Sequence, residues 1–236
     1  MNDKFLGQNI RVREGARNLP GFKQTIDQST TKILRLEETL SRLEPLLRID
    51  PLTELLNKTG MWYEIWRNCG EIGRESEKGR NRDGLGFVFY DFVNFHTVNH
   101  GIGQENGDRV MREGASVIKN THRNTDHIAR YGGDEDLAIM RVNNEEELSN
   151  ILNVRHDREG QESMSILDLI NRQMKLFMKR SFPDFVRDNG EITGTFRSGF
   201  CFVTHDEIVN NDQEDLEVII RNRLNELSIR VKGEIT

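Results

Sequence analysis

The order of apolar and polar positions along the chain predicts an α+β domain. Residues 86–91 form a short apolar run, and strand-like patterns recur over 126–131, 137–142 and 195–203. Helical spacing is expected over 58–74, 105–120, 144–152, 165–179 and 214–232. The stretches 75–84, 92–104 and 155–162 are interpreted as a loop, a turn region and a surface insertion. The order β-α-β-β-α-β predicts a mixed antiparallel sheet with helices on one face.

Upstream of this alternation the apolar spacing becomes heptad-like. The apolar positions repeat at seven, or at three and four, on a charged background: Ile26, Ile33, Leu36, Leu40, Leu43 and Leu47. They predict an amphipathic helix that packs on its own domain or forms a parallel coiled-coil stalk between two protomers. Pro45 disfavours a long uninterrupted coiled coil. We therefore divide the chain into a tail (1–24), a helical stalk and candidate dimerisation helix (25–49), and the α+β domain (50–236).

The composition narrows the classes of function. The 236 residues carry a formal net charge of −6, which argues against a non-specific grip on nucleic acid. Cys69 and Cys201 lack a CxxC spacing, as is typical of reduced cytoplasmic proteins. The N-terminus lacks the pattern of a signal peptide, and no apolar run reaches the roughly 18 residues that span a bilayer. We expect a cytoplasmic protein that binds neither nucleic acid nor membrane.

The main candidate for chemistry is the segment Arg130–Asp136, which reads Arg-Tyr-Gly-Gly-Asp-Glu-Asp. Two glycines make a tight turn between two predicted strands, and acids sit at its tip. Asp91 ends a buried strand, where a carboxylate is costly unless it is solvated, paired or bound to a metal. Because the first strand and the hairpin are neighbours in such a core, Asp91 and Asp134 could share a cation. Oxygen ligands suit Mg²⁺, so the pattern indicates phosphoryl or nucleotidyl transfer.

A glycine-containing segment leads from Asp91 into the next predicted helix. Within it, Asn99 and Asp108 are candidates for binding the edge of a purine, because a carboxylate accepts from guanine N1–H and the exocyclic amine. A structural alternative for Asp108 is that an acid near a helix start is favoured by the helix dipole. The glycines do not form a dinucleotide-binding fingerprint, because the parallel βαβ context and the later acid are missing.

Taken together, these segments resemble the GGDEF domain of diguanylate cyclases, which condense two GTP into cyclic di-GMP. The likeness runs from Asp50 through at least Val142. Three motifs carry it in order: Asp50-x-Leu52-Thr53-x-Leu55-x-Asn57-Lys58, then Asp91-x-x-x-Phe95-x-x-Val98-Asn99-x-x-x-Gly103-x-x-x-Gly107-Asp108, then Arg130-Tyr131-Gly132-Gly133-Asp134-Glu135. The resemblance implies a palm-like GGDEF domain over 50–236, preceded by the amphipathic helix.

The resemblance also implies roles for individual residues. Asp91 and Asp134 would hold Mg²⁺ or Mn²⁺ with the Phe92 carbonyl nearby, and Glu135 would help to activate the attacking 3′-hydroxyl or support the metal site. Asn99 and Asp108 would read guanine. The other implied substrate-binding positions are Phe95, His96 and Lys232, and Arg123 and Asp126 match an RxxD product-inhibition site. Each protomer of a homodimer would bind one GTP, with the two facing each other.

Several positions depart from the family pattern. The signature ends in Asp136 instead of Phe, on the strand face shared with Ala138 and Met140, where a charge must reach water, a cation or a partner. Further departures are Glu54 for Gly, Val93 for a second acid, His96 for a phosphate-contacting Lys, and the absence of Gly-Arg-Asn after Lys232. Two alternatives follow: a catalytically degenerate receptor for GTP or cyclic di-GMP, and a palm-type cyclase with another nucleotide product.

Overall fold

The structure is a computed structural model that describes residues 28–35, 38–39, 43, 46–79, 83–153, 164–189 and 194–233. The chain divides into two compact units, 1–47 and 48–236, and each is described by itself. In the first unit, the described residues 28–35, 38–39 and 43 are helical. The following parts of our predictions lie outside the described residues: the tail 1–24, the heptad positions Ile26, Leu36 and Leu40, Pro45, and the insertion 155–162.

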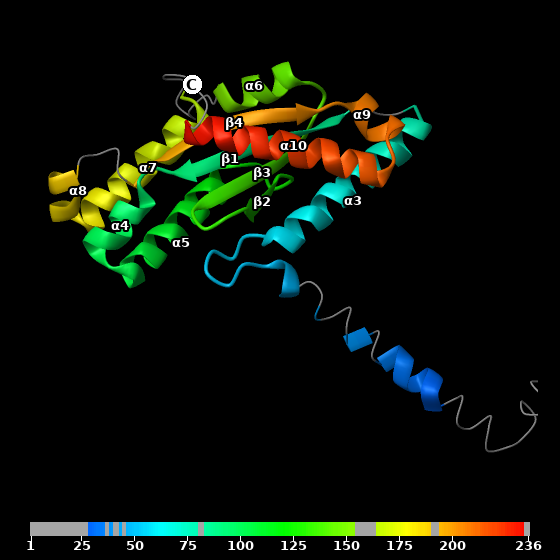
Figure 1. Ribbon diagram of the computed structural model, residues 1–236, viewed down its shortest axis with the longest axis horizontal. Coiled ribbons are helices and arrows are strands. Elements are labelled where there is room, and N and C mark those ends of the chain that lie inside the picture. Colours follow the sequence, from blue (N-terminus) through cyan, green and yellow to red (C-terminus); the bar gives the residue numbers. More distant parts are fainter. Residues whose placement is uncertain are drawn as a thin grey trace, which may run out of the picture. The chain divides into compact units, whose positions relative to one another are not determined.

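The second unit is built on a four-stranded sheet with the order β2-β3-β1-β4 (Figure 1). The strands are β1 (Gly84–Phe92), β2 (His127–Arg130), β3 (Glu135–Val142) and β4 (Phe196–Val203). All three neighbouring pairs are antiparallel. Together with the helices between the strands, this sheet confirms the predicted α+β class with its β-α-β-β-α-β order.

Helices cover both faces of the sheet, so the expectation of helices on one face was wrong. On one side, Leu85, Phe87 and Phe89 pack against the first group of helices. This group comprises α3 (Lys58–Glu77), α9 (His205–Asn210) and α10 (Gln213–Lys232). On the other side, Val88 and Tyr90 join a core formed with the second group. That group comprises α4 (Phe95–Ile102), α5 (Gln104–Thr121), α6 (Glu145–Asn153), α7 (Ile166–Ser181) and α8 (Pro183–Asn189).

The apolar run in β1 explains why both faces are covered. All nine residues of this strand are buried, and apolar side chains point to both sides of the sheet. A strand of this kind must be packed on both faces, unlike one that alternates apolar and polar residues. The continuous run was therefore a signal for the second helical layer.

Three helices were not predicted as helices. The expected turn region 92–104 contains α4, and both α8 and α9 lie in segments for which no element was proposed. Two of them had local signals: Pro183 stands at the first position of α8, and Thr204 and Glu207 form a capping box at the start of α9. A single 3₁₀ turn, η1 (Leu46–Arg48), precedes α3, which continues to Glu77 into the predicted loop.

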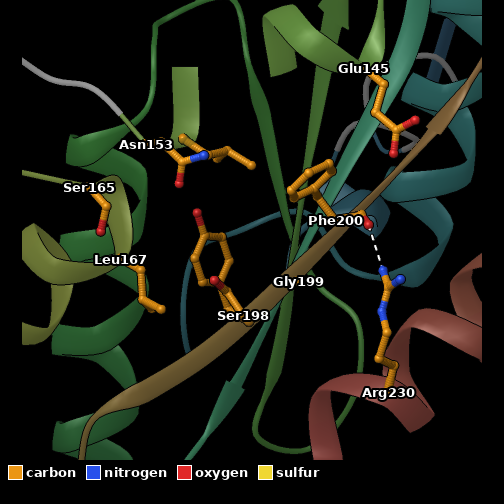
Figure 2. Close-up of a pocket in the computed structure, with 10 residues that line it drawn as sticks. Glu145, Asn153, Ser165, Leu167, Ser198, Gly199, Phe200 and Arg230 are labelled. Carbon is orange, nitrogen blue, oxygen red and sulfur yellow. Dashed lines mark hydrogen bonds between the residues drawn. The ribbon is translucent and has the colours of Figure 1, made fainter. Parts of the chain in front are cut away.

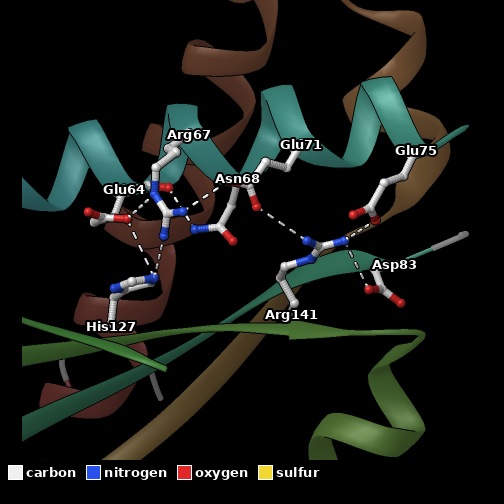
Figure 3. Close-up of polar contacts among 8 residues, drawn as sticks. All are labelled: Glu64, Arg67, Asn68, Glu71, Glu75, Asp83, His127 and Arg141. Carbon is white, nitrogen blue, oxygen red and sulfur yellow. Dashed lines mark hydrogen bonds and ion pairs between the residues drawn. The ribbon is translucent and has the colours of Figure 1, made fainter. Parts of the chain in front are cut away.

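Ion pairs fix α3 to the sheet. Figure 3 shows the Arg141 guanidinium of β3 among three carboxylates. Its Nη2 lies 2.6 Å from Glu75 Oε2 and 3.2 Å from Asp83 Oδ2, and its Nη1 lies 3.5 Å from Glu71 Oε2. These contacts hold the helix that follows the Asp50 motif against the strand that follows the Asp134 turn. No described helix is long and apolar enough to cross a membrane.

Candidate functional site

The carboxylates predicted to hold a cation come together at one end of the central strands. In the ladder between β1 and β3, Asp91 lies opposite Glu135. The Phe92 nitrogen donates to the Asp134 carbonyl over 3.1 Å, so the turn is held beside the end of β1. Burial, and then the negative charge of Asp91, raise the pKa of Asp134 above its usual value. The two carboxylates are therefore close enough to repel each other, which is an arrangement that a cation would relieve.

Two basic side chains border these carboxylates. Arg197, on β4, lies opposite Asp91 in the sheet, and its Nε is 2.6 Å from Asp91 Oδ2. Lys232, in the last turn of α10, pairs through its Nζ with Glu135 Oε1. The Arg197 Nη1 also donates to the Lys232 carbonyl over 2.8 Å. The site thus joins β1, β3, β4 and the C-terminal end of α10.

Gly132 leaves room for the Glu135 carboxylate. A Cβ there would lie 2.1 Å from Glu135 Oε2, so a larger residue would displace the end of this side chain. Arg130 stabilises the turn, because its Nη2 donates to the Gly133 carbonyl over 2.6 Å. Its Nη1 lies 3.2 Å from Asp50 Oδ1. Arg130 therefore ties the turn to the Asp50 loop, which precedes α3.

The Asp50 loop has its own internal bonds. Asp50 Oδ1 accepts from the Thr53 nitrogen over 2.9 Å and from its hydroxyl over 2.8 Å. Burial acts to raise the pKa of Asp50, but the bonds from Thr53 and the charge of Arg130 hold it below its usual value. Glu54 has a φ of 59°, in the left-handed region that favours glycine. The loop conformation thus explains why a Gly is usual at this position, and Glu54 adopts it at a cost in backbone strain.

The two predicted guanine-reading residues lie on consecutive helices. Asn99 is on α4, and the half-buried Asp108 is on α5, one turn in from its start at Gln104. Gly107 permits the close approach of the two helices, since a Cβ there would lie 1.7 Å from Asn99 Oδ1. That oxygen is buried and has no hydrogen-bond partner among the described residues. Because buried polar atoms are normally paired, this acceptor is a candidate for a ligand contact.

The remaining predicted residues have local surroundings of their own. The Phe95 ring packs on Phe92 with ring centroids 5.2 Å apart. His96 is exposed on α4 beside the His100 ring. In the turn between α5 and β2, Asp126 Oδ2 accepts from the Arg123 nitrogen over 2.9 Å. One oxygen of Asp126, a residue of the predicted product site, is therefore already used in a hydrogen bond within its own turn.

Comparison with known proteins decides the family. The model of "Diguanylate cyclase, GGDEF domain" matches residues 47–167, which is more than half of the chain. The chain belongs to the GGDEF family. It is 29% identical over 128 residues to diguanylate cyclase DosC of Escherichia coli K12, a match that covers 53% of this chain and 26% of DosC. It is 36% identical over 146 residues to the uncharacterised protein YtrP of Bacillus subtilis, covering 60% of this chain and 23% of YtrP.

A structural relative comes from Caulobacter crescentus. The crystal structure of the coiled coil and GGDEF domain of DgcB in complex with c-di-GMP covers 85% of this chain and 94% of that chain, with 20% identity and a TM-score of 0.49. The chain spans about a quarter of the length of DosC and of YtrP. The match of the family model establishes GGDEF membership for the domain.

The last residue of this chain's GGDEF signature occupies an unusual position. Asp136 is 1% exposed, and its Oδ1 has no hydrogen-bond partner among the described residues. It pairs with Arg130 and Tyr90 in the ladders on either side of β3 and lies on the same strand face as Ala138 and Met140, as predicted. Burial raises the pKa of Asp136 to about 7, although the Arg130 guanidinium acts in the opposite direction. We expected the charge of Asp136 to require water, a cation or a partner. A carboxyl that keeps its proton has no charge and does not require such a contact.

A cavity of about 370 Å³ opens beside the edge strand β4 (Figure 2). Its wall includes Ser198, Phe200 and Glu145, and Arg230 donates to the Phe200 carbonyl over 2.7 Å. None of the residues that we predicted for GTP, metal or product binding lines it. Its lining mixes one acid, one base, uncharged polar groups and apolar groups, and it gives no indication of a specific ligand.

Sequence reasoning missed Arg197 as a member of the site. The weak signal was a charged residue inside the strand pattern Phe196-Arg197-Ser198-Gly199-Phe200. Only the register of β4 against β1, which places Arg197 opposite Asp91, shows that Arg197 pairs with this carboxylate.

Proposed function

We propose that this chain is a diguanylate cyclase that condenses two GTP into cyclic di-GMP, by metal-assisted attack of a 3′-hydroxyl on an α-phosphate. The observation that carries the proposal is that Asp91 and Asp134 lie together at the end of β1. Their negative charges repel each other there, and a bound cation would relieve this repulsion. GGDEF relatives named diguanylate cyclases support it. The proposal assigns a nucleotidyltransferase activity to a site whose signature ends in Asp136.

The donor set fits a hard divalent cation. Asp134 and Asp91 offer carboxylate oxygens, and the Phe92 carbonyl would complete the protein ligands for Mg²⁺ or Mn²⁺. The described residues contain no cluster of three or more His, Cys, Asp or Glu arranged as a metal site. Few protein ligands are typical of Mg²⁺, which relies also on water and substrate phosphates. When bound, the ion would lower the pKa of the 3′-hydroxyl and neutralise charge on the phosphates.

The side chains around the carboxylates take roles that follow from their positions. Glu135, held by Lys232, would support the metal site or accept the proton of the 3′-hydroxyl. Lys232 would contact phosphate, and so would His96 from its exposed position on α4. Phe95 would shape the wall of the guanine site.

Guanine would be read by Asn99 and Asp108. The unpartnered Oδ1 of Asn99 provides an acceptor for the exocyclic amine, and the Asp108 carboxylate accepts from N1–H and that amine. Asn99 and Asp108 together would select guanine over adenine, whose N1 carries no proton.

The reaction needs two copies of the domain, so we propose a homodimer with one GTP on each protomer. The exposed apolar residues Ile33, Leu34 and Leu43 of the first unit are suited to a helical stalk between protomers. We keep the division into a tail (1–24), stalk (25–49) and GGDEF domain (50–236) as part of this proposal. Arg123 and Asp126 are the proposed contacts for the product as inhibitor. Two free cysteines and the use of GTP make the cytoplasm the proposed compartment.

A second candidate function is a receptor for GTP or cyclic di-GMP without turnover. The buried Asp136 at the end of the signature favours it, because a destabilised hairpin would hold Asp134 and Glu135 less firmly. The exposed His96 in place of a lysine also favours it. Under this second proposal, both residues would weaken catalysis more than binding.

The test is to incubate the purified chain with GTP and Mg²⁺, then with Mn²⁺, and to identify products by chromatography and mass spectrometry. Cyclic di-GMP is the expected product. Unchanged GTP, together with measurable binding of cyclic di-GMP, would favour the receptor. A different cyclic or linear nucleotide would identify another palm-type cyclase. Asp184→Ala is the matched control for variants of the site acids, because Asp184 is an exposed acid on α8 whose one ion pair among the described residues is with Arg187.

A further inference from the structure

The site has a guanidinium that the family resemblance does not account for. We propose that Arg197 is a triphosphate-binding residue of this chain, which provides from β4 the positive charge that is missing at His96 and after Lys232. This inference rests on the proposed function, because it concerns how the same site holds GTP. It names a residue on a strand where no substrate contact was expected.

The contacts of Arg197 leave one part of its side chain available. Its Nε is held by Asp91 and its Nη1 by the Lys232 carbonyl. Among the described residues, its Nη2 has no acceptor. The side chain is 45% exposed, whereas that of Asp91 is 6% exposed. The guanidinium is therefore fixed at two nitrogens, and its third has no described partner on a side chain that is nearly half exposed, which is the arrangement that suits phosphate recognition.

The charges around Arg197 also favour an anionic ligand carrying its own cation. Asp91, Asp134 and Glu135 supply three carboxylates, and Arg197 and Lys232 supply two cations. The acids therefore outnumber the cations that pair with them. A magnesium–triphosphate complex brings both signs of charge. Its metal suits the acids, and its phosphate oxygens suit Arg197 and Lys232.

A purely structural role for Arg197 has to be separated from this one. The bond to the Lys232 carbonyl caps the C-terminal end of α10, and the bond to Asp91 neutralises a buried acid. Loss of either would lower stability without any selectivity for phosphates. The distinguishing readout is therefore the contribution of the β- and γ-phosphates to binding, and not activity or stability alone.

The experiment compares the affinities of 3′-deoxy-GTP and 3′-deoxy-GMP, in Mg²⁺, for the wild-type chain and three variants. These ligands cannot be condensed, because they lack the attacking hydroxyl. Arg197→Gln removes the charge, and Arg197→Lys keeps a charge beside Asp91 but loses the fork. Arg230→Gln is the matched control, because Arg230 also joins α10 and β4 through a bond to a backbone carbonyl but contacts no carboxylate of the site.

The expected result is a fall of about 10-fold or more in triphosphate affinity for Arg197→Gln, with monophosphate affinity nearly unchanged. Arg197→Lys should also lose triphosphate affinity, by several-fold. This variant provides the test if Arg197→Gln does not fold. Arg230→Gln should bind both ligands as the wild type does. An unchanged ratio of the two affinities, or an equal loss of both, overturns the inference while the proposed function stands. Failure of the folded wild type to bind 3′-deoxy-GTP overturns both.

Discussion

Glu135 and Asp136 are consecutive acids of β3 that have opposite environments. Glu135 lies on the face of the sheet covered by α10, where Lys232 pairs with it. Asp136 lies on the other face, against the core formed with α5, and its Oδ1 has no hydrogen-bond donor among the described residues. Glu135 forms an ion pair with a cation from a distant part of the chain, whereas Asp136 forms no ion pair among the described residues.

The acids on the ligand side of this hairpin form direct ion pairs, whereas Asp136 on the opposite side forms none among the described residues. Asp91 pairs with Arg197 and Glu135 with Lys232, and both pairs border the place where a metal and phosphates would bind. On the opposite side, Arg130 is directed to Asp50 and the Gly133 carbonyl, and it influences Asp136 only through its charge. A buried acid without a hydrogen bond is stabilised by holding its proton. The two faces should therefore respond differently to mutation and to pH.

The largest effect is expected on the ligand side, from Asp134→Ala. Turnover should fall about 100-fold or more, because the variant removes one of two carboxylates that would hold the metal. The fold should remain intact, since the pKa of Asp134 is raised by burial and by Asp91, and removal relieves that repulsion. Product formation and thermal unfolding measure the two parts of the prediction. Normal product formation by this variant would refute the assignment, and Asp184→Ala provides the control.

On the opposite face, Asp136 should make stability depend on pH. Its folded pKa of about 7 lies above the ordinary value of 3.8, so the folded chain binds the proton more tightly than the unfolded chain. The free energy of unfolding should be greatest below about pH 4 and fall by up to ~4 kcal/mol as the pH rises towards 7. Asp136→Asn cannot ionise and should flatten most of this slope. Urea unfolding at pH 5 and pH 8 measures it.

Two other acids help to interpret that measurement. The raised pKa of Asp134 adds a smaller slope of the same sign, so the Asn variant should keep part of the dependence. The depressed pKa of Asp50 has the opposite sign, and its stabilisation is lost only as the pH falls below about 4. Its effect therefore lies outside the window of the experiment. A slope in Asp136→Asn equal to that of the wild type would show that Asp136 is ionised and solvated.

Most of the fold was predictable from the sequence because its signals are local. The apolar run of β1, the helical periods of α5, α7 and α10, and the Gly132-Gly133 turn each specify an element without reference to the rest. The partners of the site acids were not predictable in this way. Arg197 lies 106 residues from Asp91 in the chain, and only the register of β4 brings them together. The lack of a described hydrogen-bond partner for Asp136 Oδ1 likewise depends on which side chains surround it.

An intermediate effect is expected for Arg130→Gln, which alters the opposite face without removing an acid. The variant loses the bonds from Arg130 to Asp50 and Gly133, which should lower the free energy of unfolding by about 1–3 kcal/mol. The pKa of Asp136 should rise further, because Arg130 is the only cation among the described residues that lowers it. Denaturant unfolding and the pH slope measure these two effects. A stability loss that leaves the pH slope of Asp136 unchanged would show that Arg130 does not act on this acid.

The smallest effect is expected for Glu71→Gln, which lies on the same side of the sheet as Glu135 but in a network with several partners. The Glu71–Arg141 contact is long, at 3.5 Å, and the two side chains are 32% and 25% exposed. Arg141 would keep Glu75 and Asp83, both of which lie closer. Loss of Glu71 should therefore change the free energy of unfolding by less than about 1 kcal/mol. Asp83→Asn is the matched comparison, because Asp83 is the least exposed of the three acids, at 18%. Glu71→Gln could instead lower the free energy of unfolding as much as Arg130→Gln does. The number of alternative partners would then not explain the size of these losses, and the contrast between Glu135 and Asp136 would need another cause.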